Sequence, residues 1–473
     1  MTGVKGLTSR YFAVSTLLLC ALTTASANWP QFRGPNCSGV SESAKPPTNI
    51  TPTNALWHVE VPWSPSSPCV WGNRIFLTTI DNGELQTRCY DRKTGRQLWS
   101  RIVKPEKLEI YHASEGSPAA STPATDGQRV VSYFGSFGFL CHDFSGKELW
   151  RHPLPLVDSP GGFGSGTSPA IFGNHVVLLR DQNQGSTVMA LDVRTGKTKW
   201  ETPRPEAFGS FGTPIVWKHG SVQELVTPGS LRLQSYDLQT GKERWMVDGV
   251  TTFSCTTPVI GDGLLYFAGW SPGKSDSPFP SWKSFLDMND KNKDGQVTFE
   301  EMPPSDRDFA RGMDSNHDGK ITKEDWDILQ GRIAKGQNVL VAIKPDGTGN
   351  ITDSHVAWKF TRGLPYVPSP LFYDGRLYLI KDGGMVSAFE AKTGKTFYLQ
   401  ERLGTVGSYY ASPVAADGRI YTISVPGKLT VLKAGGDKPE ILHQADFKER
   451  AFATPAPVGN NLYLRTEKTL WAF

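Results

Sequence analysis

One stretch of the sequence places oxygen-bearing side chains at the alternating spacing that a hard metal ion requires. Asp290, Asn292, Asp294, Gln296, Thr298 and Glu301 occupy positions 1, 3, 5, 7, 9 and 12 of a loop, with Gly295 at position 6. Ca²⁺ takes about six to eight oxygen ligands, and a glycine at the sixth position permits the sharp turn that lets them converge. Glu301 would close the coordination sphere with two oxygens, Gln296 would supply its backbone carbonyl, and Thr298 would act through a water. The sequence therefore predicts a calcium site here.

A second stretch repeats the pattern 24 residues later, with Asp314, Asn316, Asp318, Lys320, Thr322 and Asp325 in the same places and Gly319 at the turn. Both match the EF-hand loop. Asp325 departs from the usual glutamate and is one methylene shorter, so its preference for Ca²⁺ over Mg²⁺ stays open. An Asp- and Gly-rich surface turn could imitate one loop by chance, but two in tandem favour metal binding. We expect two Ca²⁺ sites with a mainly structural role.

The residues around these loops have helical character. Trp282, Phe285 and Leu286 form an apolar stripe before the first loop, and Trp326, Leu329 and Ile333 recur at helical spacing after the second. Ser305 could cap a helix that reaches Gly312, and Val297 could pair with Ile321 between the loops. We predict a small α-helical domain over residues 271–337, whose apolar residues form its own core.

The rest of the chain is organised by a repeat that must position this domain. A Ser/Thr-Pro step followed by a two-residue turn and a β-rich run occurs eight times: Ser67-Pro68, Thr122-Pro123, Ser168-Pro169, Thr213-Pro214, Thr257-Pro258, Ser369-Pro370, Ser412-Pro413 and Thr454-Pro455. The spacing is 42 to 55 residues except for one gap of 112, which fits four-stranded blades with an insertion in the fifth. The predicted fold is an all-β, eight-bladed β-propeller.

Two further features support a closed ring of blades. A turn of the type Asp91...Thr94-Gly95-Arg96...Trp99 recurs between the third and fourth strands of a blade, and we interpret its Asp and Trp as framework residues. The eighth unit has only three strands before Phe473, so residues 56–61 should supply its fourth strand and remove the exposed edges. The propeller then spans residues 55–270 and 338–473, after a leader at 28–54.

These repeats resemble the pyrroloquinoline-quinone-like propeller repeat found in quinoprotein dehydrogenases and in BamB-type outer-membrane assembly factors. The segment from Trp29 to Pro35 also resembles the leader of secreted propellers in this superfamily. The resemblance implies the fold and leaves the function open.

The N-terminal residues indicate export. Lys5 and Arg10, the apolar run from Ala13 to Leu22 and the small residues 25–27 predict a cleavable signal peptide over residues 1–27. We expect a periplasmic or extracellular protein without a transmembrane segment. Cleavage lowers the formal charge from +4 to +2, so nucleic acid is not an expected partner. Five cysteines remain, and their pairing stays open.

A second candidate site lies where the loops between blades converge. Chain direction places the loops from the fourth strand of one blade to the first strand of the next (D–A loops) on the same face as the insertion. These loops carry Tyr111, His112, Glu115, Phe163, Phe208, Phe211, Phe253, Cys255, Tyr366, Tyr409, Tyr410, Arg450 and Phe452. Such a funnel could bind a protein, glycan or small molecule at the channel mouth, or its aromatic rings could fill the channel. His112 and Glu115 are an acid–base pair close in sequence.

Two functions fit these features. We favour a non-catalytic binding or scaffold propeller that Ca²⁺ stabilises. The alternative is a quinoprotein dehydrogenase that oxidises alcohols or sugars with pyrroloquinoline quinone. Such enzymes often carry a disulfide between adjacent cysteines, and no two cysteines are adjacent here. The EF-hand ligands also come from their own loops, which leaves no calcium for the quinone, so we do not expect this cofactor.

Overall fold

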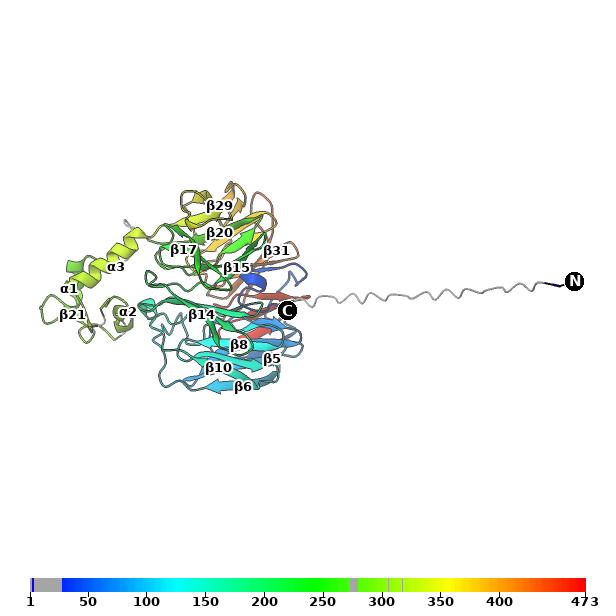
Figure 1. Cartoon of the computed structure of the whole chain (residues 1–473), viewed down its shortest axis with the longest axis horizontal. Helices are drawn as coiled ribbons and strands as arrows, with labels where there is room; N and C mark the ends of the chain where they lie inside the picture. The colour runs from blue at the N-terminus through cyan, green and yellow to red at the C-terminus, as the bar shows by residue number, and fades with distance from the viewer. Residues whose placement is uncertain (1, 4–27, 273–279, 305, 317) are drawn as a thin grey trace.

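The computed structural model describes residues 2–3, 28–272, 280–304, 306–316 and 318–473. Within these ranges, eight antiparallel sheets of four principal strands follow one another around an axis, which confirms the eight-bladed β-propeller (Figure 1). All of the proposed signal peptide except residues 2–3, and the cap at Ser305, lie outside the described residues. Among those that are described, no helix has the length and apolarity needed to cross a bilayer.

The blades follow the predicted repeat. Blades one to four are β3 (Cys69–Trp71), β4 (Arg74–Asp81), β5 (Glu84–Asp91) and β6 (Gln97–Val103); β7 (Ala124–Thr125), β8 (Arg129–Phe134), β9 (Gly138–Asp143) and β10 (Glu148–Pro153); β11 (Ala170–Phe172), β12 (His175–Arg180), β13 (Thr187–Asp192) and β14 (Thr198–Pro203); and β15 (Ile215–His219), β16 (Val222–Pro228), β17 (Arg232–Asp237) and β18 (Glu243–Asp248). Blades five to seven are β19 (Val259–Gly261), β20 (Leu264–Gly269), β23 (Val339–Ile343) and β25 (Val356–Phe360); β26 (Leu371–Tyr373), β27 (Arg376–Lys381), β28 (Met385–Glu390) and β29 (Thr396–Arg402); and β30 (Val414–Ala416), β31 (Arg419–Ile423), β32 (Lys428–Lys433) and β33 (Glu440–Asp446).

Blade eight is built from both ends of the propeller sequence. It contains β34 (Ala456–Val458), β35 (Asn461–Arg465), β36 (Thr469–Ala472) and β2 (Trp57–Glu60). Strand β2 pairs antiparallel with β36, with Trp57 opposite Ala472. The predicted closure is therefore confirmed. Two short strands extend other blades: β1 (Val40–Ser41) pairs with β30, and β24 (Gly349–Asn350) pairs with β18.

The repeated Trp and Gly hold neighbouring blades together. Trp57 of blade eight lies on the turn of blade one, where a Cβ added to Gly95 would meet the indole ring at 2.5 Å. Only glycine fits beneath the ring, and its φ of +72° suits glycine as well. The indole N–H donates to the carbonyl oxygen of Arg92 at 3.1 Å. The same bond is made at 3.0 Å by Trp99, Trp150, Trp200 and Trp358. These residues are framework, as predicted.

The Ser/Thr of each repeat forms a hydrogen-bonded ring around the axis. The backbone N–H of Ser67 donates to Thr122 Oγ1 at 2.9 Å, and each following blade repeats the bond to its neighbour until Thr454 returns to Ser67. The bonds of Thr122, Ser168, Thr213, Thr257, Ser369 and Ser412 measure 3.0 to 3.4 Å. Because every member is buried, these bonds satisfy polar groups that would otherwise destabilise the centre.

The leader crosses the far end of the channel. Trp29 bridges to Val70 of β3, Asn36 exchanges two hydrogen bonds of 2.8 Å with Val216 of β15, and Arg33 donates to the carbonyl of Pro370 at 2.7 Å. Along the innermost strand of each blade, these contacts come after the Ser/Thr residue, on the side away from the D–A turn of the chain. The leader, including the short 3₁₀ turn Pro35–Cys37, thus ties blades on several sides of the axis together.

Candidate functional site at the channel mouth and the insertion

The segment between β20 and β23 of blade five is a small helical domain that projects from the propeller (Figure 1). It contains α1 (Trp282–Asn289), β21 (Val297–Thr298), α2 (Arg307–Arg311), β22 (Lys320–Ile321) and α3 (Lys323–Lys335). Val297 pairs with Ile321, as the sequence predicts. Its core contains Phe285, Val297, Met302, Ala310, Met313, Ile321, Trp326, Leu329 and Ile333. The apolar stripes therefore form the domain's own core.

In the first loop, Glu301 joins the two ends of the twelve-residue segment. One carboxylate oxygen accepts from the backbone N–H groups of Lys291 and Asn292 at 3.1 and 3.2 Å, and the other accepts from Thr298 N–H at 2.8 Å. The hydrogen bond from Thr298 is the main cause that lowers the pKa of Glu301. Asp290 accepts from Gly295 N–H at 3.0 Å, and Gly295 has a φ of +82°. The loop thus has the turn that its glycine predicts.

The second loop repeats these contacts with the shorter Asp325. Its carboxylate accepts from Ser315 N–H at 3.0 Å and from Thr322 N–H at 2.9 Å, and Asp314 accepts from Gly319 N–H at 2.9 Å. Asp325 also forms a capping box with Thr322 at the start of α3. Asp314 and Asp325 are 4% and 1% exposed. The Asp325 carboxylate therefore both closes the second loop and caps α3.

The donor chemistry of the loops suits a hard cation, but their carboxylates face the backbone of the loop. Within the part of the chain that the structure describes, no group of three or more His, Cys, Asp or Glu side chains is placed to hold a metal. In the same residues, no ion pair joins any of the six loop carboxylates to a Lys, Arg or His. Each twelve-residue loop contains three carboxylates, whose mutual repulsion a divalent ion would relieve.

Some of the aromatic residues on the D–A loops lie together at the channel mouth, whereas Tyr111 and Tyr409 do not line the cavity there. The former residues line a pocket of about 230 Å³, which we call the channel-mouth pocket. Its walls include Phe163, Phe211, Tyr366, Tyr410 and Phe452, with the hydroxyl ring beneath. Phe32 from the leader also contacts this pocket. The aromatic side chains thus line a cavity, and the leader contributes a wall that the sequence did not reveal.

The side chains of His112 and Glu115 do not form an acid–base pair. Glu115 accepts a hydrogen bond of 2.7 Å from the hydroxyl of Tyr410, which lies on a different blade. His112 stacks on Phe163 at 5.7 Å, and its Nδ1 lies 3.0 Å from Ser114 Oγ. Burial, followed by the proximity of Glu115, raises the pKa of Tyr410. His112 and Glu115 therefore have separate side-chain partners.

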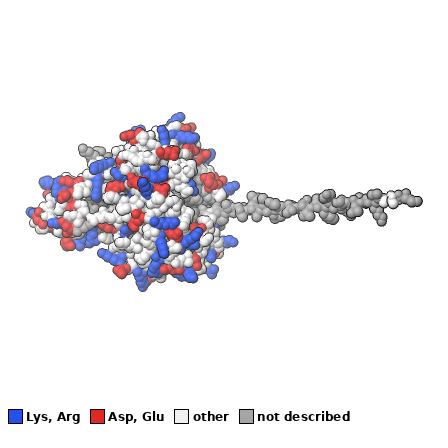
Figure 2. Space-filling view, viewed as in Figure 1, with Lys and Arg blue, Asp and Glu red and all other residues white. Residues whose placement is uncertain are grey.

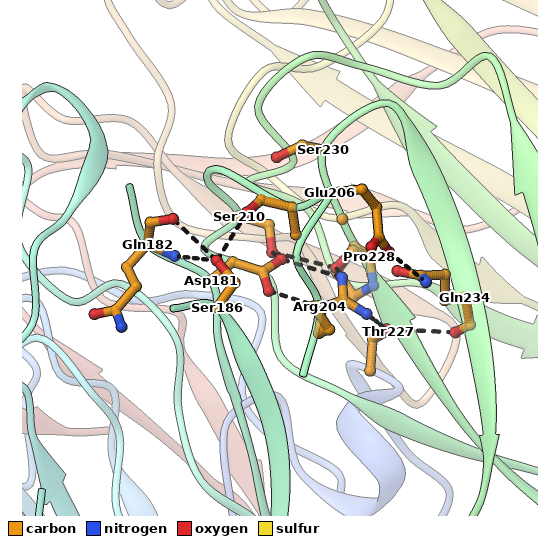
Figure 3. Close-up of polar contacts among 12 residues, drawn as sticks. Asp181, Gln182, Ser186, Arg204, Glu206, Ser210, Thr227, Pro228, Ser230 and Gln234 are labelled. Carbon is orange, nitrogen blue, oxygen red and sulfur yellow. Dashed lines mark hydrogen bonds and ion pairs between the residues drawn. The ribbon is translucent and has the colours of Figure 1, made fainter. Parts of the chain in front are cut away.

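A buried ion pair fixes the loop that carries Phe208 and Phe211. Arg204 donates to both oxygens of Asp181 at 2.8 and 3.1 Å, and both side chains are fully buried (Figure 3). Asp181 also accepts from Ser210 Oγ at 2.7 Å, in the middle of the loop. Ser230 Oγ accepts from Phe208 N–H at 3.1 Å. This network holds one aromatic wall of the mouth in a single arrangement.

Charges on the surface are mixed. Figure 2 shows basic and acidic side chains interspersed on the visible face of the propeller and the insertion. This face therefore shows no large patch of a single charge.

The fold is that of an eight-bladed β-propeller, and several known proteins are similar to this chain in sequence or in structure. A family described as "Outer membrane protein assembly factor BamB" matches residues 48–156 and 81–252. The match lies within residues 48–252, less than half of the chain, and shows that these repeats are similar to those of that family. Among curated proteins, the serine/threonine-protein kinase AfsK of Streptomyces griseus is 33% identical over 118 residues. That match covers 25% of this chain and only 13% of the kinase's length.

Solved structures show the same fold at low identity. BamB from Moraxella catarrhalis is 13% identical with a TM-score of 0.53, and the match covers 89% of this chain and 96% of that chain. A europium-containing methanol dehydrogenase is 11% identical with a TM-score of 0.57, and the match covers 94% and 98% of the two chains. The neighbours thus include BamB and a methanol dehydrogenase, so the fold does not distinguish a scaffold from a dehydrogenase.

Proposed function

We propose that this chain is an exported, calcium-binding β-propeller scaffold that binds its partner at the face formed by the D–A loops and the insertion. Calcium has a structural role: it neutralises the loop carboxylates and keeps the helical domain docked at the channel mouth. The observation that carries the proposal is the position of α3. Asp325, in the second loop, caps the start of this helix, and the other end lies against a D–A loop, where Thr252 Oγ1 contacts the carbonyl of Arg332 at 3.3 Å.

The second loop also reaches the propeller directly. Gln184, between β12 and β13, donates to the carbonyl of Ser315 at 3.3 Å. The N–H of Gln337, just beyond α3, donates to the carbonyl of Val250 at 3.0 Å. Ordering of the second loop should therefore also order the contact with the propeller, because α3 connects the two. This arrangement favours a structural cation over a signalling switch, because extracellular modules bind Ca²⁺ with dissociation constants of about 10⁻⁴ to 10⁻³ M.

The channel-mouth pocket does not suit pyrroloquinoline quinone. This cofactor is a tricarboxylate, and the described residues that line the pocket include Glu115 but no Lys, Arg or His. A buried anion without a cationic partner is strongly disfavoured. The cysteines that the structure describes are all free thiols, so none forms a disulfide over the pocket. These observations favour a scaffold over a dehydrogenase.

Calorimetry with Ca²⁺, followed by hydrogen exchange with and without chelator, tests the proposal. We expect saturable binding and calcium-dependent protection of residues 281–335, while the propeller stays protected in chelator. Asp290→Ala with Glu301→Ala should remove the stronger site, and Asp314→Ala the weaker. Asp287→Ala is the matched control, because Asp287 lies in α1 outside the loops and pairs with Lys283 on the surface. Absence of Ca²⁺ binding, or equal protection in both conditions, would contradict the calcium role.

A separate assay tests the alternative function. The protein is incubated with Ca²⁺ and pyrroloquinoline quinone, and bound quinone and dye-linked oxidation of alcohols and sugars are measured. We expect neither stoichiometric binding nor turnover. Both together would establish a dehydrogenase in place of a scaffold.

A further inference from the structure

A second cavity lies between α3 and the D–A loops, next to the channel-mouth pocket. It has a volume of about 490 Å³ and shares Phe163, Phe211 and Tyr366 with that pocket. We call it the α3 cleft. Leu329, Arg332 and Ile333 form its wall on the helix side. The volume falls within the range of about 300–1,000 Å³ typical of small-molecule sites.

The cleft has an aromatic lining with one charged side chain among its described residues. Phe208, Phe253 and Trp270 join the three shared aromatic residues on the walls. Phe208 and Phe253 meet edge to face at 5.7 Å, as do Trp270 and Tyr366 at 5.5 Å. The charged residue is Arg332, and no Asp or Glu lines the cavity. The lining is therefore apolar with a single positive group.

The Arg332 guanidinium has no acidic partner among the described residues, unlike Arg204 and Arg450. Its guanidinium carbon lies 4.3 Å from the centre of the Phe208 ring, a cation–π contact. Within the described residues, its guanidinium makes no hydrogen bond or ion pair, whereas Arg204 has Asp181 and Arg450 has Glu467. Burial lowers the pKa of Arg332, but a guanidinium stays charged at neutral pH because the ordinary pKa of arginine lies far above 7. Its planar N–H groups are thus available to an anion.

The aromatic wall on which Arg332 packs is held in place by the propeller. Phe208 and Phe211 lie on the loop that contains Ser210, and the Phe208 N–H donates to Ser230 Oγ. The Ser210 hydroxyl donates to Asp181, which pairs with Arg204 (Figure 3). A rigid aromatic wall lowers the entropy cost of binding a flat, apolar body. A ligand whose flat apolar part lies between the aromatic rings and whose acidic group binds the Arg332 guanidinium would match both the apolar lining and the single positive charge of the cleft.

We infer that the α3 cleft binds a small organic monoanion with an aromatic or similarly flat apolar body, and that Arg332, the one charged residue in its described lining, recognises its carboxylate or sulfonate group. This inference rests on the proposed function for the location of the binding face and adds the class of ligand. The Phe208 ring holds the guanidinium on one side, and the ligand's acidic group accepts its N–H groups on the other.

Titration of the full-length mature protein with three probes of one shape tests the inference. The probes are 2-naphthoate, 2-naphthalenesulfonate and the neutral 2-naphthamide, and binding is measured by calorimetry and by tryptophan fluorescence. We expect saturable binding of at least one anion and at least tenfold weaker binding of the amide. Arg332→Gln should weaken the anion at least tenfold and leave the amide unchanged. Arg376→Gln is the matched control, because Arg376 stacks on Phe397 at 3.6 Å on β27 and does not line the cleft.

A second variant keeps the test informative if Arg332→Gln alters the insertion. Leu329→Trp should fill the cleft from α3 and abolish anion binding while Arg332 stays in place. The inference is wrong if neither anion binds, if the amide binds as tightly as the anions, or if Arg332→Gln has no effect in a folded variant. Ca²⁺ calorimetry on the same samples separates the two proposals: calcium binding without probe binding removes only the ligand inference, and probe binding without calcium binding removes only the calcium role.

Discussion

The backbone N–H of Thr454 donates to the hydroxyl of Ser67 at 2.9 Å, although the two residues are 387 positions apart. This bond completes the ring of Ser/Thr contacts around the axis. Strand β2 closes the same blade at its outer edge by pairing with β36. The propeller is therefore closed at the axis and at the rim by segments from opposite ends of the sequence.

Deleting residues 54–61 should destabilise the whole propeller, because β36 would lose its partner and expose an open edge. We expect the free energy of unfolding to fall by at least about 4 kcal/mol, beyond the range of an ordinary surface change. Thermal and urea unfolding, followed by circular dichroism, measure the effect. Glu60→Gln, an exposed change on the same strand, is the control and should melt like the wild type. Unchanged cooperative melting of the deletion variant would refute the closure.

Asp181→Asn should destabilise the protein by about 3 kcal/mol, because it leaves the Arg204 guanidinium buried without its counter-charge. Glu440→Gln is the control, since its pair with Lys433 is more than half exposed and should matter by less than about 1 kcal/mol. Urea unfolding gives the free energies. Hydrogen exchange at residues 207–212 should also increase in Asp181→Asn alone. A loss no larger than that of the control would show that the pair contributes little.

The stability of the protein should decrease between pH 6.5 and 4 because of His142. This side chain is 2% exposed, and burial lowers its pKa to about 4 from 6.5. The unfolded chain therefore takes up the proton first as the pH falls, and the folded state loses stability. His142→Leu should reduce the difference in unfolding free energy between pH 7 and pH 4.5 by about 2 kcal/mol. His112→Leu, at an exposed position, should leave that difference unchanged. An equal pH response in both variants would argue against His142.

The sequence predicted the blades and their closure because these features repeat. Identical Ser/Thr-Pro steps, turn glycines and tryptophans recur once per blade, and each has the same local cause wherever it occurs. The leader and the α3 cleft do not repeat. Phe32 contacts the channel-mouth pocket through a segment whose partners lie far away in sequence, and Arg332 is one of several charged residues on an ordinary amphipathic helix. Only the packing of α3 on Thr252 and Phe208 distinguishes Arg332. His112 and Glu115 failed as a pair because closeness along a loop does not direct two side chains toward each other.

Exchanging the residues that close the two loops should exchange their affinities for Ca²⁺. Asp325→Glu adds the methylene that lets a carboxylate reach a cation with both oxygens, and we expect roughly tenfold tighter binding at the second loop. Glu301→Asp removes that reach and should weaken the first loop by a similar factor. The position of Asp325 sharpens the test, because this buried carboxylate also accepts from Thr322 N–H at the start of α3. Glutamate should keep that bond only if the loop opens enough to admit the extra methylene.

Calorimetry of the two single variants and of the double exchange measures the affinities, and circular dichroism checks that α3 is retained. Asp327→Glu is the control for the longer side chain, because Asp327 lies in the same helix and pairs with Lys323 on the surface. It should bind Ca²⁺ like the wild type. If Asp325→Glu binds no more tightly while α3 stays intact, then the twelfth position does not limit the second site, and the capping of α3 would be the main role of Asp325.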